Sequence, residues 1–321
     1  MAEDQTHRIV ITGATGTLGR HAVELLSSDP NTHILLPLRR LDPALAKLPP
    51  NVQTQALDLT DAAQMRRMFS EFSPDVIIHC AASGVRPDRE DWFAMTRFNT
   101  ESALQLFESA CRLPDCHFIH ISTALVYCDQ GRPLRETDPL ETRHPYAASK
   151  AAADLLLQAA AVEFDRRLTL LRPFTFTGAH DGGRRLFPAL LRAAAAGQPF
   201  PMSPGAQRRD FCAAQDIAEA IRAAVHTPRR EAIEIFNLGS GVDLPLRTIV
   251  GNVCRELQLG VDLQFGALPY HPQEPMHLVA DIDKAAQLPW KPRTNLAYAV
   301  WELAQSTYPG LAVCRPRMTY E

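Results

Sequence analysis

The stretch Thr12-Gly13-Ala14-Thr15-Gly16-Thr17-Leu18-Gly19 lies between two apolar segments and decides the fold of the chain. Residues 8–11 before it are largely β-branched, which predicts a strand, and residues 21–26 after it have apolar positions at helical spacing. A strand, a glycine-rich turn and a helix in this order form the first unit of a dinucleotide-binding fold. An ordinary glycine-rich turn without a ligand is the alternative, and the flanking strand and helix argue against it.

Each glycine of this turn has a different expected role. Gly13 lets the chain turn sharply off the strand, Gly16 leaves room for a pyrophosphate beside the backbone, and Gly19 lets the helix pack closely on the sheet. The N–H groups that open the helix then face the phosphates. We therefore predict cofactor contacts from Gly13, Thr15, Gly16, Thr17, Leu18 and Gly19.

The rest of the chain continues the alternation of strands and helices as far as residue 173. Strands are expected at 33–38, 52–57, 75–82, 116–121, 168–173 and 232–239. Between them, helical patterns cover 61–72, 92–111 and 146–164. Regular alternation is typical of an α/β fold with a doubly wound parallel sheet, the Rossmann arrangement. Pro37 predicts that the strand at 33–38 is short or near its end.

The length of 321 residues, 46% of them hydrophobic, predicts roughly two domains. We expect a dinucleotide-binding domain at 1–173, to which 206–240 return. Residues 174–205 and 241–321 are expected to form a smaller α/β substrate-binding lobe.

Composition argues against several classes of partner. The net charge of −3 and the lack of a basic run disfavour nucleic acid. No apolar stretch approaches the roughly 20 residues that span a bilayer, and the first residues lack the apolar region of a signal peptide. The seven cysteines are scattered without a CxxC pair, which favours free buried thiols in the cytoplasm and disfavours a metal site.

Two arginines, Arg39 and Arg40, directly follow the second expected strand. In this fold an acid at that place bonds the ribose 2′-hydroxyl of NAD(H), whereas an arginine accommodates the 2′-phosphate of NADP(H). We therefore expect NADP(H) to be preferred and NAD(H) to remain possible. The alternative is that both arginines are solvated surface residues.

A second motif, Tyr146 to Lys150, carries the expected chemistry. Residues four apart share one face of a helix, so the ammonium lies beside the phenol and lowers its pKa. Such a tyrosine exchanges a proton with an alcohol or carbonyl oxygen near neutral pH, and the lysine also bonds the nicotinamide ribose. Thr123, at the carboxyl end of the strand at 116–121, offers a hydroxyl to the same oxygen. The catalytic residues are thus Thr123, Tyr146 and Lys150.

With these motifs the chain resembles an extended short-chain dehydrogenase/reductase of the NAD-dependent epimerase/dehydratase type. The resemblance covers nearly the whole chain. One further motif of the family is a threonine four residues before the tyrosine of a Val-Tyr-Gly signature. Here these residues are Thr123 and Tyr127, and Cys128 replaces the family's glycine. The other matching segments are 171–178, Arg209-Asp210-Phe211, 237–241 and 281–292.

The resemblance adds ligand contacts. It implies that Asp58 and Leu59 meet the adenine, and the small residues Ala81 and Ala82 let the nicotinamide ribose lie against the backbone. Further cofactor contacts are expected from Tyr146, Lys150 and Pro173. The substrate class it implies is a nucleotide-diphosphate sugar, contacted by Ser83, Thr123, Thr175, His180 and Arg209.

Two of these substrate residues have structural alternatives. Arg209 resembles the arginine that meets the diphosphate or the nucleotide ribose, and a fork of donors suits that role. A salt bridge from Arg209 to Asp210 or Asp216 is the alternative. His180 is alternatively an ordinary loop histidine.

The residues after Thr123 narrow the reaction. The family's 4,6-dehydratases carry an Asp-Glu pair where this chain has Ala124-Leu125, so dehydration is disfavoured. Its decarboxylases place a glutamate, and its 3,5-epimerase/reductases a cysteine, at the position of Leu125. Two reactions survive: reduction of a 4-keto nucleotide sugar by NADPH, and 4-epimerisation with tightly held NAD. Arg39 and Arg40 favour the reductase.

Two other hypotheses about the function remain open. One is a non-catalytic, NADP-sensing regulator, against which the intact Thr123, Tyr146 and Lys150 argue. The other is a hydrophobic ketone as substrate. The resemblance also implies a homodimer formed by a four-helix bundle from the helices at 92–111 and 146–164.

Overall fold

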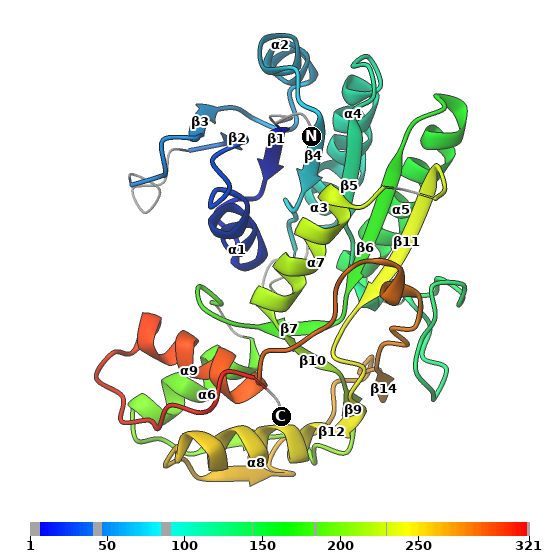
Figure 1. The fold of residues 1–321 in the computed structure, drawn as a ribbon. Helices are drawn as coiled ribbons and strands as arrows, with labels where there is room; N and C mark the ends of the chain where they lie inside the picture. The colour runs from blue at the N-terminus through cyan, green and yellow to red at the C-terminus, as the bar shows by residue number, and fades with distance from the viewer. Residues whose placement is uncertain are drawn as a thin grey trace. The chain divides into compact units, whose positions relative to one another are not determined.

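The computed structural model describes residues 7–40, 47–84, 91–142, 144–182, 185–228 and 230–319 (Figure 1). Its main sheet has seven strands in the order β11-β6-β5-β4-β1-β2-β3. These strands are β1 (His7–Thr12), β2 (Thr32–Leu38), β3 (Val52–Ala56), β4 (Val76–His79), β5 (His117–Ile121), β6 (Leu168–Pro173) and β11 (Ile233–Leu238). The registers are parallel, so the expected doubly wound fold is confirmed.

Helices cover both faces of this sheet (Figure 1). One face packs against α2 (Ala62–Phe72), α4 (Ser102–Ala110) and α5 (Pro145–Glu163), whose apolar side chains meet Val10, Ile77 and Phe118 of the strands. On the other face lie α1 (Thr17–Leu26) and α7 (Ala214–His226). Within the described residues no helix, including α5 with its 19 residues, combines the length and apolarity needed to cross a bilayer.

Pro37 lies near the end of its strand, as expected. β2 runs to Leu38, and Pro37 pairs with Gln55 of β3. Ile34 and Leu38 direct their hydrogen bonds toward the β3 side, so the position of Pro37 faces the β1 side. The pairing of β2 with β1 ends at Leu35, and the proline therefore removes no hydrogen bond from the sheet.

The helix expected at 92–111 is interrupted. The structure has α3 (Trp92–Met95), a π-helical segment (Thr96–Glu101) and then α4. The π-helical segment widens the helix at Asn99, whose side chain is fully buried and bonded to other elements. The hydrogen bonds of Asn99 to other elements offset the energetic cost of the less regular π-helical backbone.

The first compact unit comprises Met1–Val126, Leu140–Arg172 and Ile221–Phe236, and the second comprises Tyr127–Pro139, Pro173–Ala220 and Asn237–Glu321. The expected boundary after residue 173 lies one residue from the observed one. Residues 127–139, 206–220 and 237–240, expected in the dinucleotide-binding domain, lie instead in the second unit.

The second unit has its own apolar core, formed by α6 (Leu186–Ala195), α8 (Leu246–Leu257) and α9 (Leu296–Thr307). Around it lie three small sheets. Their strands are β7 (Thr175–Thr177) with β10 (Phe211–Ala213), β8 (Phe200–Met202) with β13 (Leu263–Phe265), and β9 (Arg208–Arg209) between β12 (Leu244–Pro245) and β14 (His277–Leu278). None of these strands was expected, because strands this short have no clear periodicity.

Candidate active site

The glycine-rich turn joins β1 to α1 at the point where the strand order reverses. Gly13 has φ +70°. A Cβ at this position would lie 2.6 Å from the backbone nitrogen of Ala81, two residues after the end of the neighbouring strand β4. Gly19 touches the carbonyl of Gly13 from the first turn of α1. Both positions therefore require glycine, as the spacing predicts.

No side chain caps the start of α1. Gly16 is the N-cap residue, and the first turn holds no acidic residue. The positive end of the helix dipole therefore favours an anion at this place. The turn thus fits the pyrophosphate of a dinucleotide.

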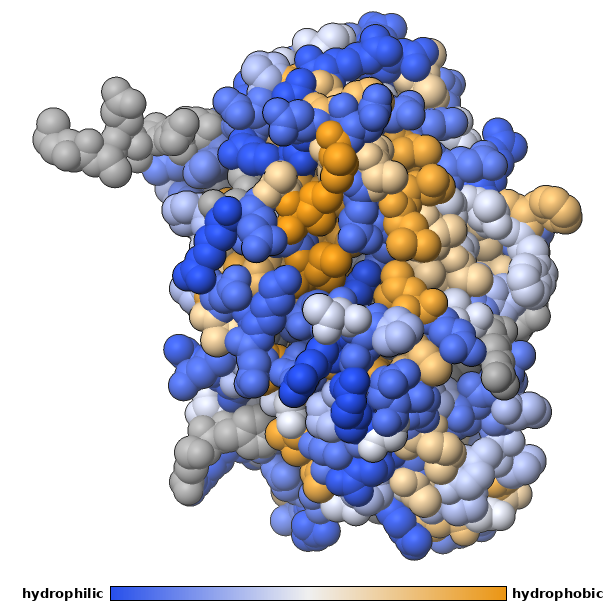
Figure 2. Space-filling model, turned by 90° about the vertical axis from the view of Figure 1, so that its right-hand side faces the viewer, coloured by the Kyte–Doolittle hydropathy of each residue, from blue (hydrophilic) through white to orange (hydrophobic). Residues whose placement is uncertain are grey.

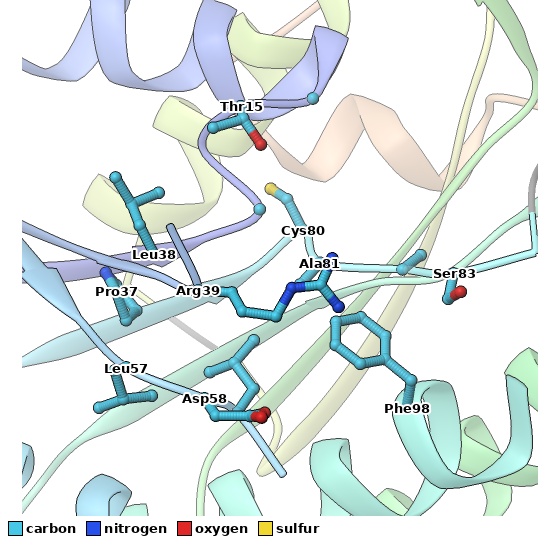
Figure 3. Close-up of a pocket in the computed structure, with 14 residues that line it drawn as sticks. Thr15, Pro37, Leu38, Arg39, Leu57, Asp58, Cys80, Ala81, Ser83 and Phe98 are labelled. Carbon is cyan, nitrogen blue, oxygen red and sulfur yellow. The ribbon is translucent and has the colours of Figure 1, made fainter. Parts of the chain in front are cut away.

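A pocket of about 340 Å³ opens above the carboxyl ends of β1, β2, β3 and β4 (Figure 3). The described residues that line it are Gly13, Thr15, Gly16, Pro37, Leu38, Arg39, Leu57, Asp58, Leu59, Cys80, Ala81, Ala82, Ser83 and Phe98. Nine of the predicted contact residues meet here. Thr17, Leu18 and Gly19 begin α1, Arg40 lies next to Arg39 and Pro173 ends β6, and none of these lines the pocket.

Arg39 and Asp58 lie at the same end of the pocket. Figure 3 shows the Arg39 side chain extending into the pocket toward Phe98. Asp58 accepts hydrogen bonds from the backbone N–H and the hydroxyl of Thr60, at 2.9 and 2.8 Å. These bonds are the main cause of its lowered pKa, to which Arg39 and Arg97 also contribute. The pair offers a carboxylate and a guanidinium to an adenosine.

The three expected catalytic residues all belong to the first unit. Thr123 follows β5 and is half-buried, and its Oγ1 accepts from the N–H of Leu125 at 3.3 Å. Tyr146 is the second residue of α5, which begins with Pro145, and its side chain is buried. α5 packs against the 3-10 helix Ala124–Val126, which begins directly after Thr123. The fold thus brings the threonine to the helix that carries Tyr146 and Lys150.

Lys150 is buried to 1% exposure, and its ammonium has two neutral acceptors. Nζ donates to the carbonyl of Ile121 at 2.6 Å and lies 3.0 Å from Nε2 of His120. Burial lowers the pKa of Lys150 to about 8, and the charge of Asp154 opposes this shift. His120 was not predicted from the sequence. His120 lies two residues after Phe118 on β5, so both side chains point to the same face of the sheet, the one that α5 covers. This period of two could have indicated the position of His120.

Asn99 is a second residue that was not predicted. Its side chain accepts from the N–H of Ser83 at 2.7 Å and donates to the carbonyl of Ser83 and to Oγ of Ser149. It therefore ties the rim of the pocket to the helix of Tyr146. A lone asparagine in a helical pattern gives no signal of such a role, because the π-helical segment that places it is invisible in the sequence.

The remaining predicted substrate residues lie in the second unit. Thr175 begins β7 and is half-buried, and His180 is an exposed turn residue with φ +65°. Arg209, in β9, is buried and donates to the carbonyl of Arg208 and to Glu274. The salt bridge considered for it with Asp210 or Asp216 is wrong.

The two aspartates are occupied elsewhere in the second unit. Asp210 accepts from Ser240 and the N–H of Gly241, and Asp216 accepts from the N–H and hydroxyl of Thr294. Burial lowers the pKa of Arg209, and Glu274 opposes this. Arg209 thus presents a buried cation that already has one carboxylate partner.

Known proteins resemble this chain over most of its length. A trifunctional UDP-glucose 4,6-dehydratase/UDP-4-keto-6-deoxy-D-glucose 3,5-epimerase/UDP-4-keto-L-rhamnose-reductase from Arabidopsis thaliana is 25% identical over 312 residues, which are 92% of this chain and 46% of that protein. The chain thus spans about half the length of that relative. A UDP-glucose 4-epimerase from Neisseria gonorrhoeae is 30% identical over 266 residues, 73% of this chain and 78% of the relative.

Solved structures share the fold. A UDP-glucuronic acid 4-epimerase from Bacillus cereus, in complex with UDP-glucuronic acid and NAD, aligns with a TM-score of 0.84 at 24% identity. The alignment covers 93% of this chain and 98% of that one. The family model described as the NAD dependent epimerase/dehydratase family matches residues 9–239. The chain belongs to the NAD-dependent epimerase/dehydratase family.

Proposed function

We propose that this protein reduces the 4-keto group of a nucleotide-diphosphate sugar with NADPH. The observation that carries the choice of cofactor is Arg39, which directly follows β2 and lines the pocket. A guanidinium suits a phosphate because it donates several hydrogen bonds in one plane. A bound nicotinamide supplies the hydride.

The chain's own residues handle the proton and the oxygen. Tyr146 donates a proton to the ketone oxygen, Thr123 donates a hydrogen bond to it, and Lys150 lowers the pKa of the phenol. Ala124 and Leu125 follow Thr123, so no carboxyl group there assists loss of water. Thr123, Tyr146 and Lys150 are the only side chains that this reduction requires for proton transfer.

The second candidate is 4-epimerisation of a nucleotide sugar with bound NAD. It is favoured by the relatives, several of which are UDP-glucose 4-epimerases, and by solved structures with NAD. An epimerase returns the hydride to the opposite face and has no net use for NADPH. The two reactions therefore differ in cofactor preference and in cofactor turnover.

The test begins with titration of the protein with NADPH and NADH, followed by a screen of nucleotide 4-keto sugars such as UDP-4-keto-6-deoxy-D-glucose. Tighter binding of NADPH and its oxidation with the ketone are expected. Equal affinity or a preference for NADH removes the reason for choosing reduction. Conversion of UDP-glucose to its 4-epimer without net cofactor consumption establishes the epimerase, and binding without either turnover points to a regulator.

The protein is also proposed to form a homodimer through α3, α4 and α5. Figure 2 shows apolar residues gathered on the upper part of the side that it views. In the described parts of α3 and α5 the large exposed apolar residues are Trp92, Phe93, Leu155, Leu156 and Val162. Light scattering is expected to give twice the chain mass, and Leu156→Glu is expected to halve it. Leu268→Glu, at a similarly exposed leucine of the second unit, is the control. A monomeric wild-type protein contradicts the proposal.

A further inference from the structure

We propose that His120 is a positioning residue for Lys150: its Nε2 holds the ammonium at the active site and sets the pH range over which the lysine keeps its proton. The inference rests on the proposed role of Lys150. It concerns a residue of the sheet interior that is not part of the lining of the pocket described above.

The contact fixes the state of both groups. An ammonium carries three donors and no acceptor, so Nε2 of His120 must be unprotonated while Lys150 is charged. The histidine then carries its proton on Nδ1. Nζ and Nε2 are 3.0 Å apart, and both side chains are buried to 1% exposure or less. No solvent competes for this bond.

The nearby carboxylate does not replace the histidine. Asp154 lies one turn after Lys150 on α5, but its Oδ2 accepts from Nε of Arg172 at 3.0 Å and from Oγ of Ser122 at 2.9 Å. Arg172 therefore balances the charge of Asp154. The two acceptors that hold the Lys150 ammonium, the imidazole of His120 and the carbonyl of Ile121, are neutral, and a neutral acceptor stabilises an ammonium less than a carboxylate would.

The titratable and charged groups around Lys150 come from every neighbouring element: His79 at the end of β4 and Cys80 directly after it, His120 of β5, Arg172 of β6, and Tyr146 and Asp154 of α5. Burial lowers the pKa of His79 to about 3 and that of His120 well below its ordinary value. Burial also raises the pKa of Cys80 to about 12. The imidazoles and the thiol are thus neutral near pH 8, where Lys150 changes charge.

A histidine at this place carries a cost. Within the described residues, Nδ1 of His120 and Nε2 of His79 are buried without a hydrogen-bond partner, and the two rings lie 5.2 Å apart. An unsatisfied buried polar atom is unfavourable by about 1–3 kcal/mol. A phenylalanine ring would fill similar space without that cost, so the bond to Lys150 is what the histidine contributes.

The first test follows Lys150 directly in the protein without cofactor or substrate. The chain has four lysines, at 47, 150, 284 and 291, so NMR of protein labelled at lysine 13Cε resolves them, and Lys150→Met assigns the signal. The wild-type midpoint is expected near 8. His120→Phe is expected to lower it by about one pH unit, because the ammonium loses an acceptor. His120→Gln, which offers an amide oxygen, is expected to restore most of the shift.

The matched control is His117→Phe. His117 is also buried in β5, but it contacts Thr169 at 2.9 Å and faces away from α5. This variant is expected to leave the Lys150 midpoint unchanged. An unchanged or higher midpoint in His120→Phe overturns the proposal.

A second test uses the wild-type protein, so it does not depend on whether a variant folds. Two-bond 1H–15N spectra of the wild-type protein report the tautomer of each histidine, and His120 is expected to carry its proton on Nδ1 below the Lys150 midpoint. A proton on Nε2 in that range overturns the proposal. Neither measurement involves turnover, so both remain decisive if the protein fails to reduce 4-keto sugars.

Discussion

Asp154 and Arg172 form an ion pair inside the first unit, with Oδ2 of the carboxylate 3.0 Å from Nε of the guanidinium. Both side chains are buried to 2% exposure or less. Burial raises the pKa of Asp154, and the charges of Arg172 and Lys150 act against that rise. The pair joins α5 to β6 beneath the lysine of the active site.

Asp154→Asn is expected to lower the free energy of unfolding by about 3–5 kcal/mol, because it leaves the Arg172 guanidinium buried without a counter-charge. Urea denaturation followed by circular dichroism measures the change. Glu71→Gln, which breaks the exposed pair with Arg67, serves as the control and should change stability far less. Equal effects in the two variants would contradict the assigned importance of the buried pair.

Gly13→Ala is expected to abolish binding of NADPH and to destabilise the protein. The new Cβ meets the backbone of Ala81 and also requires an L-residue at φ +70°. Gly131→Ala separates the two effects, since Gly131 has φ +64° but no atom within 4 Å of an added Cβ. The control is expected to lose about 1 kcal/mol of stability and to keep its cofactor affinity. Isothermal titration and thermal unfolding measure both quantities.

Arg39→Glu is expected to reverse the cofactor preference. A carboxylate repels a 2′-phosphate and accepts from a 2′-hydroxyl, so NADPH affinity should fall by roughly 10- to 100-fold while NADH affinity rises. Arg40→Glu, next in sequence but absent from the pocket lining, makes the same charge change. If both variants lose NADPH equally, the effect is long-range electrostatics rather than contact.

Tyr146→Phe is expected to reduce kcat by roughly 10²- to 10⁴-fold with little effect on cofactor affinity, because it removes the proton donor alone. Steady-state oxidation of NADPH with a 4-keto sugar measures the loss. Tyr308→Phe, in the half-buried residue after α9, should retain full activity. Turnover that survives Tyr146→Phe refutes the mechanism.

Lys150 also predicts how stability depends on pH. The unfolded lysine keeps its proton up to about its ordinary pKa of 10.5, whereas the folded one loses it near 8. Between these values the unfolded chain binds more protons, so the free energy of unfolding gains at most about 1.4 kcal/mol per pH unit as pH rises.

Lys150→Met lacks this term, so the stability of the wild type relative to the variant should increase from pH 8 upward. Urea denaturation at a series of pH values tests it. The buried thiols titrate equally in both proteins and cancel in the difference. A constant difference would show that Lys150 keeps an ordinary pKa in the folded chain.

Local patterns were enough for the dinucleotide-binding half of the molecule. The β1 turn and α1 are contiguous in sequence, and Tyr146 and Lys150 lie one turn apart on α5, as their spacing predicts. Arg39 and Asp58 follow neighbouring parallel strands, which places them at one edge of the sheet.

Contacts between distant segments could not be predicted in this way. The partner of Arg209 is Glu274, from a different part of the second unit, and no periodicity connects them. Asn99 acts through a π-helical segment that tertiary bonds stabilise. The sequence places Pro37 near the end of its strand, but it does not show that the pairing with β1 stops at Leu35, before the proline.

The place of β11 has a consequence for how the chain folds during synthesis. β6 pairs with β11 along its outer edge, with hydrogen bonds from Leu168 to Ala232 and from Phe174 to Leu238. Between the two strands the chain builds a large part of the second unit. On the ribosome, β6 therefore presents an open edge until residues 233–238 emerge, and an open edge is a template for pairing with other chains. A truncated chain that ends after Pro173 would keep this edge exposed and aggregate.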